Sequence, residues 1–254
     1  MGKYLIDINL KGKTAVVTGA TKGIGRAAAI ALHQVGANII ALGRNDKELT
    51  SLKKKLKKRI KTFSCDMNNY RKLKEIVYSQ KRIDVLINNA GTNLPEPFLK
   101  VKQSSLKTLL NVNTKAAFNM AKLCTDKMLE LKNRNKVGGV IVNTSSKFGI
   151  VAGPDRTVYS MTKFGIEGLT RGMAVDLAKY NIRANSVCPT FVETPRVRKY
   201  FKNKAFKKFA MENLPLGRIA SESDVATAIA FLSSDAASMI TGTNIIIDSG
   251  WTAK

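Results

Sequence analysis

Short apolar runs alternate along the chain with longer segments in which apolar residues recur at helical spacing. Seven of these runs are bounded by turn residues and cover residues 14–18, 38–42, 60–64, 83–87, 139–144, 182–187 and 244–247. They are rich in valine and isoleucine, which is typical of strands in a parallel sheet buried on both faces. The segments between them are long enough for helices, which predicts repeated β–α–β units with right-handed crossovers. We therefore expect an α/β fold in which residues 1–254 form a single domain around a doubly wound, seven-stranded parallel sheet with helices on both faces.

The segment after the second predicted strand is expected to be an amphipathic helix. Asn45 can cap its start, and Glu48, three residues later, completes a capping-box pattern. Its apolar residues recur at helical spacing: Leu49, Leu52, Leu56 and Ile60. The lysine-rich run 53–61, KKKLKKRIK, is then the solvated side of this helix. Because no aromatic residues are interleaved in the run to stack on bases, it is a poor candidate for nucleic-acid binding.

Composition limits the chemistry. The 254 residues carry 43 lysines and arginines against 18 aspartates and glutamates, so the formal net charge is +25 and the surface should attract anions. One histidine and three scattered cysteines leave too few soft ligands for a zinc site and no base for a Ser-His-Asp triad. These residues are His33, Cys65, Cys124 and Cys188. We expect no metal site, buried cysteines, and a half-buried or exposed His33 without a catalytic part.

The cysteines and the apolar pattern of the chain also indicate a cellular compartment. Three cysteines without paired spacing do not suggest a disulfide framework, which favours a reducing compartment. Asp7 and Lys11 interrupt the N-terminal stretch, so it lacks the apolar core of a signal peptide. No run approaches the ~20 apolar residues needed to cross a bilayer. We therefore expect a cytoplasmic protein that has no membrane partner.

A glycine-rich loop follows the first predicted strand and leads into an alanine-rich helical stretch. It reads TGATKGIG over residues 18–25. Glycines allow the backbone to approach a pyrophosphate, and the N-terminus of the following helix offers free N–H groups and a positive dipole. The spacing G-x-x-x-G-x-G departs from the G-x-G-x-x-G fingerprint. Alone, the loop is equally compatible with nucleotide binding and with a tight turn.

The end of the second predicted strand bears on the choice of dinucleotide. An NAD site usually places a carboxylate there for the ribose 2′-hydroxyl, whereas an NADP site needs a cation for the 2′-phosphate. The strand ends in Leu42-Gly43-Arg44-Asn45, without a carboxylate. Arg44, together with Lys22 in the loop, could hold a phosphate, although both could also be ordinary surface cations. The pattern favours NADP(H) and leaves NAD(H) possible.

Tyr159 and Lys163 are four residues apart on a predicted helix that continues through Ala178, so their side chains share a face. A phenol with a pKa near 10 is about 0.1% ionised at neutral pH, and a neighbouring ammonium favours its ionised form. Ser145 and Ser146 follow the fifth predicted strand at its carboxyl end. Open α/β sheets bind their ligands at that edge, which also holds the glycine loop and the NNAG sequence of residues 88–91.

Together these features resemble the short-chain dehydrogenase/reductase family across nearly the whole chain. The matching features are TGxxxGxG at 18–25, Asp66 after the third strand, NNAG at 88–91, an asparagine before the fifth strand, Ser146 thirteen residues before Tyr159, and YxxxK at 159–163. The resemblance implies a Rossmann fold and an NAD(P)-dependent enzyme that transfers a hydride between the nicotinamide and a carbonyl or secondary alcohol.

The resemblance also implies a catalytic tetrad of Asn113, Ser146, Tyr159 and Lys163. The family's asparagine stands five residues before a phenylalanine, which selects Asn113 over Asn111 because of Phe118. In this family the tyrosine exchanges a proton with the carbonyl oxygen, the serine hydrogen-bonds that oxygen, the lysine holds the nicotinamide ribose, and the asparagine anchors a water. The cofactor contacts implied are Gly19, Thr21, Lys22, Gly23, Ile24, Gly25, Arg44, Asp66, Met67, Asn89, Ala90, Gly91, Tyr159, Lys163, Pro189, Thr190, Val192 and Thr194.

The expected substrate lid spans about residues 190–215, including the basic stretch PRVRKYFKNKAFKKF at 195–209. The family commonly has Pro-Gly after the sixth strand, whereas this chain has Pro189-Thr190, as in relatives resembling L-xylulose and dicarbonyl reductases. With the polar loop 92–97, this favours a sugar, polyol or sugar acid, as in the glucose and gluconate dehydrogenase branch. Candidate pocket residues are Asn93, Phe148, Arg156 and Phe191.

Two other functions remain open. A 3-oxoacyl-acyl-carrier-protein reductase would bring an acidic carrier to the basic rim of the site. A nucleic-acid-binding protein that retains a dinucleotide site would instead use the positive charge, but the chain has no recognisable motif for it and we expect no specific nucleic-acid partner.

Gly165, Gly168 and Gly172 form a stripe on the helix of Tyr159 where another helix could approach, and similar proteins form dimers and tetramers there. We expect a homo-oligomer, with a homotetramer as one form; packing within one chain is the other explanation for this stripe.

Overall fold

Seven parallel strands form one sheet in the order β3-β2-β1-β4-β5-β6-β7. The computed structural model describes residues 8–131 and 138–253. The strands are β1 (Thr14–Thr18), β2 (Asn38–Gly43), β3 (Ile60–Ser64), β4 (Val85–Asn88), β5 (Gly139–Thr144), β6 (Ile182–Pro189) and β7 (Asn244–Ile247). All seven predicted strands are confirmed, with shifted ends for three: β2 runs on to Gly43, β4 covers Val85–Asn88 instead of 83–87, and β6 runs on to Pro189.

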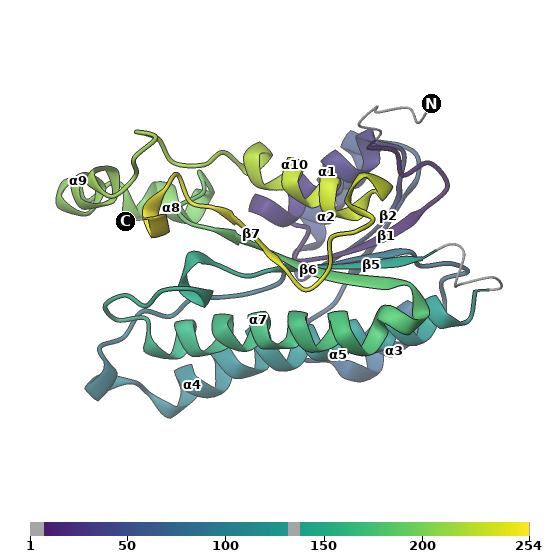
Figure 1. The fold of residues 1–254 in the computed structure, drawn as a ribbon, viewed down its shortest axis with the longest axis horizontal. Coiled ribbons are helices and arrows are strands. Elements are labelled where there is room, and N and C mark those ends of the chain that lie inside the picture. The colour runs from purple at the N-terminus through teal and green to yellow at the C-terminus, as the bar shows by residue number, and fades with distance from the viewer. Residues whose placement is uncertain (1–7, 132–137, 254) are drawn as a thin grey trace.

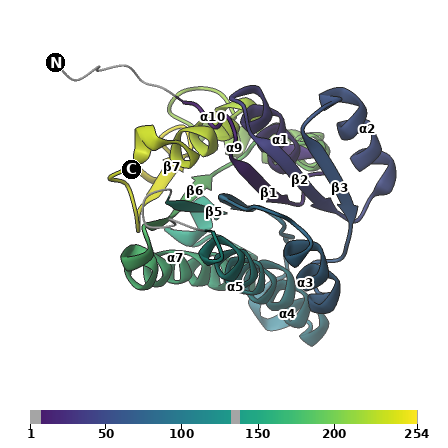
Figure 2. The same cartoon turned by 90° about the vertical axis from the view of Figure 1, so that its right-hand side faces the viewer.

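Helices cover both faces of the sheet, as Figures 1 and 2 show. One face carries α1 (Gly23–Gln34), α2 (Asp46–Leu56) and α10 (Glu222–Ser233), and the other carries α3 (Tyr70–Tyr78), α4 (Gln103–Leu109), α5 (Ala116–Leu129) and α7 (Thr157–Leu177). Successive residues of β1 serve the two cores, since Ala15 and Val17 pack with the first group and Val16 with the second. The doubly wound α/β fold predicted from the apolar runs is therefore confirmed.

Helix α2 differs from expectation in half of its capping box and at its C-terminal end. Its N-cap is as predicted, because Asn45 Oδ1 accepts a hydrogen bond from Glu48 N at 3.1 Å. The Glu48 carboxylate lies 3.7 Å from Arg26 Nη1 on α1, so the reciprocal half of the expected capping box does not form. The helix ends at Leu56 because Lys57 has a φ of +61°, and Ile60 begins β3. The expectation that Ile60 belongs to the apolar face of this helix is wrong.

The remaining composition-based expectations concern single residues. All three cysteines are free and buried, as predicted. His33 is half-buried on α1, where its Nε2 lies 3.0 Å from the carbonyl oxygen of Lys58. Lys53, Lys54 and Lys55 are exposed on α2, which confirms the solvated face. Within residues 8–131 and 138–253, no helix combines the length and the hydropathy that a bilayer crossing needs.

The chain between β6 and α10 leaves the sheet and returns to the same place. Two helices lie in this segment, α8 (Pro195–Tyr200) and α9 (Lys204–Glu212), and Figure 1 shows them beyond one end of the sheet. Val192 and Ala220 form a parallel bridge, and Ala220 N donates to the carbonyl oxygen of Phe191 at 3.0 Å. The two ends of the segment are thereby fixed to each other.

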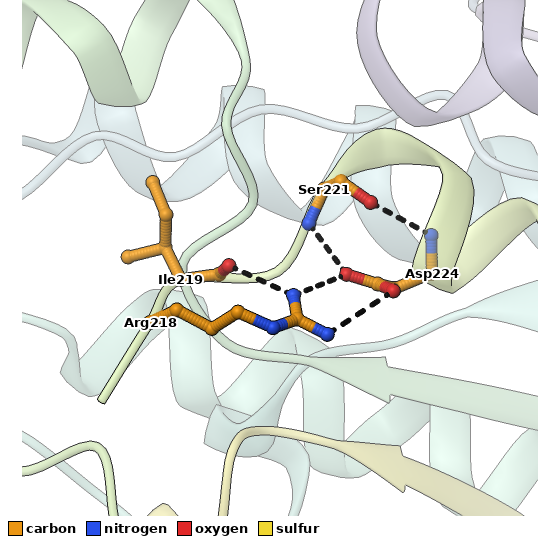
Figure 3. Close-up of polar contacts among 4 residues, drawn as sticks. All are labelled: Arg218, Ile219, Ser221 and Asp224. Atoms are coloured by element: carbon orange, nitrogen blue, oxygen red, sulfur yellow. Dashed lines mark hydrogen bonds and ion pairs between the residues drawn. The ribbon is translucent and has the colours of Figure 1, made fainter. Parts of the chain in front are cut away.

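A capping box secures the returning end, as Figure 3 shows. Ser221 Oγ accepts from Asp224 N at 3.1 Å, and the Asp224 carboxylate accepts from Ser221 N at 2.8 Å. Arg218 donates to the same carboxylate at 2.7 Å and to the carbonyl oxygen of Ile219 at 3.3 Å. The arginine and the backbone N–H of Ser221 lower the pKa of Asp224 to about 2.

We expect Asp224→Asn to lower the free energy of unfolding by about 1 kcal/mol at pH 7, because a neutral amide oxygen replaces the charged acceptor of the Ser221 N–H at the start of α10, whereas the ion pair with Arg218 is screened by solvent. A lowered carboxyl pKa stabilises the fold above the ordinary aspartate value of 3.8, and this contribution is lost as the pH falls toward about 2. Urea unfolding at pH 7 and pH 3 should therefore show a smaller difference between the two proteins at pH 3. Asp126→Asn, which removes the exposed Lys122–Asp126 pair on α5, is the control. An equal loss in both variants would contradict the role given to the capping box.

Candidate active site

A cavity of about 980 Å³ opens at the carboxyl ends of the central strands, where the sequence predicts the site. Residues from the glycine loop, the ends of β4, β5 and β6, and α7 line it. Of the residues predicted for catalysis or cofactor binding, the cavity wall includes Ile24, Asn89, Gly91, Ser146, Tyr159, Lys163, Pro189, Thr190, Val192 and Thr194. The four candidate pocket residues, Asn93, Phe148, Arg156 and Phe191, also line it. The other predicted residues lie outside its wall: Gly19, Thr21, Lys22, Gly23, Gly25, Arg44, Asp66, Met67, Ala90 and Asn113.

The glycine loop is fastened to the end of β4. Thr18 Oγ1 accepts hydrogen bonds from Asn89 N at 2.9 Å and Ala90 N at 3.0 Å. In return, Asn89 Nδ2 donates to the carbonyl oxygens of Thr18 at 3.0 Å and Gly19 at 3.4 Å. A Cβ at Gly25 would overlap both that side-chain amide and the carbonyl oxygen of Gly19. The loop and the NNAG segment therefore form one tightly packed unit.

The geometry of this loop fits a pyrophosphate. Gly19 and Gly23 have φ values of +66° and +62°, a region that favours glycine. Helix α1 begins at Gly23 with Lys22 at the N-cap, and it has neither a side-chain cap nor an acidic residue in its first turn. Its first N–H groups are thus left for an anion. Gly23 also lies against Thr194, since a Cβ there would be 3.3 Å from Thr194 Cγ2, which joins the loop to the segment after β6.

Two buried hydroxyls in the cavity wall fit a polar ligand as well. Thr144 Oγ1 at the end of β5 and Thr190 Oγ1 after β6 have no hydrogen-bond partner within the described parts of the chain. Buried polar groups are nearly always hydrogen-bonded, so these two atoms indicate where a bound molecule supplies the partner. With the uncapped start of α1, they make the site compatible with a dinucleotide.

Arg44 and Asp66 meet beyond the ends of β2 and β3. Arg44 Nη1 lies 3.7 Å from Asp66 Oδ2, and the arginine side chain is 79% exposed. Asp66 Oδ1 accepts from Asn68 N at 2.8 Å, which fixes the carboxylate. Thr21 reaches the same strand end, because a Cβ at Gly43 would overlap its Cγ2. The two side chains expected at the adenosine end are therefore adjacent, and the guanidinium is open to a ligand.

The predicted tyrosine and lysine lie on the same face of α7. Lys163 Nζ is 5.6 Å from the centroid of the Tyr159 ring and donates to the carbonyl oxygen of Thr144 at 2.8 Å. A Cβ at Gly91 would be 3.3 Å from Asn113 Oδ1 and 3.9 Å from Lys163 Nζ, so these two side chains flank the NNAG backbone. Ser146, at the end of β5, lines the same cavity and is nearly buried.

Asn113 lies in a π-helical turn (Leu110–Lys115) between α4 and α5. Its side chain accepts from Thr92 N at 2.8 Å and donates to Thr92 O at 2.9 Å and to Thr162 Oγ1 at 3.1 Å. Both N–H groups of the amide are thus used within the protein. The residue ties the loop after β4 to α7, and π-turns inside helices are frequent at functional sites.

Lys147 is a part of the site that the sequence analysis missed. The residue follows Ser146 in the turn Lys147–Gly149, is 2% exposed and lines the cavity. Its Nζ lies 2.8 Å from the ring centroid of Trp251, 4.9 Å from that of Phe191 and 5.0 Å from that of Phe148. Burial lowers the pKa of Lys147 to about 7; Asp248 opposes this shift and Arg156 adds to it. The sequence feature that could have indicated this is the position of the lysine, directly after the predicted catalytic serine.

Aromatic side chains from α8, α9 and the C-terminal segment cover the cavity. They pack edge to face around Phe191, whose ring centroid lies 5.6 Å from that of Phe206 and 5.7 Å from those of Phe201 and Trp251. Phe209 extends the cluster to Trp251 at 5.9 Å. The segment after β6 therefore closes one side of the cavity with an apolar wall.

Comparison with known proteins gives consistent matches along the chain. A family model described as enoyl-(acyl carrier protein) reductase matches residues 19–252. The 3-oxoacyl-(acyl-carrier-protein) reductase FabG of Thermotoga maritima is 37% identical over 250 residues, which cover 96% of this chain and 99% of that protein. The L-xylulose reductase of Mus musculus is 33% identical over 248 residues, covering 98% and 100%.

A solved structure of similar shape is the gluconate 5-dehydrogenase from Burkholderia cenocepacia in complex with NADP and tartrate. It superposes with a TM-score of 0.91 at 28% sequence identity, and the match covers 98% of this chain and 99% of that one. The similarity therefore extends over the whole sheet and its helices, including the segment that closes the cavity.

Proposed function

Since the chain belongs to the short-chain dehydrogenase/reductase family and is an NAD(P)-dependent oxidoreductase of carbonyl and alcohol groups, we propose that it uses NADP(H) on a sugar, polyol or sugar acid. The observation that carries the proposal is the shared cavity of Ser146, Tyr159 and Lys163 beside the glycine loop. In this proposal the nicotinamide, when bound, supplies or accepts the hydride.

The side chains have separate parts in this proposal. Tyr159 gives its phenolic proton to the carbonyl oxygen during reduction and takes it back during oxidation. Ser146 donates a hydrogen bond to the same oxygen as negative charge develops there. Lys163, held by the carbonyl oxygen of Thr144, stabilises the phenolate through its charge and would hold the nicotinamide ribose of a bound cofactor. Asn113 positions the loop after β4, and because both N–H groups of its amide are used, a water would rest on one of its oxygens.

Arg44 supports the choice of NADP(H). Its exposed guanidinium stands at the end of β2, where an NAD site usually has a carboxylate. Asp66 holds the guanidinium at the adenosine end without burying it. The gluconate 5-dehydrogenase of similar fold was solved with NADP, which agrees with this choice.

We expect Arg44→Ala to raise KM for NADPH about tenfold to a hundredfold, because a charge-assisted hydrogen bond to phosphate is lost. KM for NADH should change by less than about twofold, since that cofactor lacks the 2′-phosphate. Steady-state kinetics with each cofactor measures the two KM values and their ratio. Arg71→Ala removes another exposed arginine, which is paired with Glu75 on α3, and serves as the control. Equal effects of Arg44→Ala on the two cofactors would contradict the proposed phosphate contact.

The proposed substrate class rests on the polar loop after β4, on Pro189-Thr190, and on the similarity to L-xylulose reductase and gluconate 5-dehydrogenase. The segment 190–215 is the proposed lid over this substrate, and its two ends are fixed by the Val192–Ala220 bridge. A carbonyl panel with NADPH tests the class. Turnover of acyl thioesters with inert sugars and sugar acids would overturn it.

The second candidate function is 3-oxoacyl-acyl-carrier-protein reductase. It is favoured by the 37% identity to the Thermotoga maritima enzyme and by the exposed Lys199 at the cavity. An acidic carrier would suit the basic rim. Competition between carrier thioesters and sugars in one assay separates the two candidates.

We also propose a homo-oligomer, either a dimer or a tetramer. Phe118 on α5 and Met161 and Phe164 on α7 are large apolar side chains that are about half exposed. Outside their own helix backbone, no atom of the described residues lies within 4 Å of a Cβ position at Gly168 or Gly172, so another helix could approach them, whereas Gly165 faces Thr114 of the same chain.

A further inference from the structure

The amine of Lys147 is buried in the wall of the cavity, and none of the described residues forms a direct ion pair with it. Among the residues that the structure describes, no carboxylate lies within ion-pairing distance of its Nζ, and its neighbours are the rings of Phe148, Phe191 and Trp251. Taking an ammonium out of water is costly unless it is paired, and cation–π contacts offset this cost only in part. Burying a lysine at this position therefore costs folding free energy, which a packing role alone does not explain.

The position of Lys147 is also fixed relative to the proposed reaction. It directly follows Ser146, and the ring of Phe148 packs edge to face on that of Tyr159 with 6.2 Å between centroids. A carbonyl held between Ser146 and Tyr159 would thus place the rest of the substrate next to this amine. Among the described residues, three other cations line the cavity. Lys163 is buried, but it donates to the carbonyl oxygen of Thr144 beside Tyr159. Lys199 is exposed, and Arg156 is half-buried and donates to the backbone of Asp155, so water screens their charges more than that of Lys147.

We propose that Lys147 is a specificity-determining residue that binds a carboxylate of the substrate, so that the enzyme prefers keto acids and hydroxy acids over neutral ketones and alcohols. This inference rests on the proposed function, because it places a carbonyl substrate between Ser146 and Tyr159. The aromatic rings hold the amine in place, and the incoming carboxylate supplies the ion pair that none of the described residues forms with it.

The amine must be protonated to bind a carboxylate in this way. Several titratable or charged groups lie on the elements packed against the turn of Lys147: Arg156, Tyr159, Lys163 and Glu167 at or on α7, Cys188 on β6 and Asp248 after β7. Because burial lowers the pKa of Lys147 to about 7, the free enzyme loses the ammonium as the pH rises through that value. Affinity for an acid substrate should then fall above about pH 7, whereas affinity for a neutral one should not. The other titratable groups affect both substrates alike. The ratio of the affinity for the acid substrate to that for the neutral substrate therefore reports the titration of Lys147.

The test compares 5-keto-D-gluconate with L-sorbose, which carries a hydroxymethyl group in place of the carboxylate, using NADPH and the full chain. In Lys147→Met, we expect KM for the keto acid to rise about tenfold to a hundredfold and KM for L-sorbose to change less than about twofold. Lys147→Arg keeps the charge and should retain the preference for the acid while losing its pH dependence near 7. Lys179→Met is the control, because Lys179 also lies over an aromatic ring, 5.2 Å from the centroid of Tyr180, away from the cavity.

Two measurements do not depend on the variants. The first is the pH profile of kcat/KM for both substrates in the unaltered enzyme, where a flat ratio between pH 6 and pH 8.5 would overturn the inference. The second is calorimetric binding of tartrate, which is expected to weaken about tenfold or more in Lys147→Met and to be unchanged in Lys179→Met. If L-sorbose and the keto acid are turned over equally well, the inference fails and the proposed function stands. If no sugar or sugar acid is turned over, the proposed function fails, and tartrate binding that is equal in Lys147→Met would overturn the inference as well.

Discussion

Replacing Tyr159 by phenylalanine is expected to lower kcat about a thousandfold, because general acid–base catalysis contributes about 10² to 10⁴ to a rate. The substitution removes one oxygen atom and keeps the ring, which packs edge to face on Phe148 at 6.2 Å. Lys163 keeps its hydrogen bond to the carbonyl oxygen of Thr144, so the cavity should retain its shape. We therefore expect the Kd for NADPH to stay within about twofold of the unaltered enzyme.

The measurement pairs NADPH oxidation with a fluorescence titration of NADPH in the absence of substrate. Tyr180→Phe is the matched control, since Tyr180 also has a lysine amine over its ring, that of Lys179, yet lies outside the cavity. Activity of Tyr159→Phe within about twofold of the unaltered enzyme would contradict the proton transfer assigned to the phenol. Equal losses of catalysis and NADPH binding would instead point to a collapsed cavity.

Local sequence patterns were sufficient to predict the sheet and the edge of it at which the candidate site residues lie. The continuous apolar runs gave seven strands because each strand is covered on both faces, and the carboxyl ends of parallel strands necessarily share one edge. That edge brings Asn89, Ser146 and Thr190 to one cavity although they are far apart in the chain. The spacing of Tyr159 and Lys163 gave their common face because a helix sets it locally.

Features that depend on distant contacts could not be predicted in this way. The cage around Lys147 needs Trp251, which is far along the chain and reaches the cavity only because the C-terminal segment folds back onto Phe191. Glu48 turns to Arg26 because α1 and α2 lie side by side, which no capping pattern reveals. The π-turn at Asn113 is likewise invisible in a helical pattern, since it shifts the hydrogen bonds without changing which residues are apolar.

The end of α2 shows the opposite error, in which a local pattern was extended too far. Leu49, Leu52 and Leu56 are buried as the helical spacing predicts. Ile60 fits the same spacing, but Lys57 and Arg59 both have positive φ values, so the chain turns before reaching it. An isoleucine one turn beyond a helix is equally suited to start a strand, and the pairing of Ile60 with Ile39 of β2 decides the outcome.

Replacing Gly25 by alanine is expected to lower the free energy of unfolding by about 3 kcal/mol, near the upper end for an overpacked site. The new Cβ would overlap the carbonyl oxygen of Gly19 and the side-chain amide of Asn89, and neither can move independently. Asn89 Nδ2 is bonded to the Thr18 carbonyl oxygen at 3.0 Å, and Thr18 in turn accepts from the backbone of Asn89. Relief of the overlap must therefore shift the whole glycine loop.

That shift should also weaken NADPH binding by more than about tenfold, because the loop and the uncapped start of α1 are the proposed pyrophosphate site. Thermal unfolding and an NADPH titration measure the two effects separately. For a chain of this length, about 3 kcal/mol corresponds to a fall in Tm of roughly 6 to 12 °C. Ala31→Gly, the reverse exchange on the same helix, is the control: it should cost about 1 kcal/mol and leave NADPH affinity unchanged. Gly25→Ala could instead show the same Tm and the same NADPH affinity as the unaltered protein. In that case the loop and the NNAG segment are not the rigid unit that their hydrogen bonds indicate, and the cofactor must be held elsewhere in the cavity.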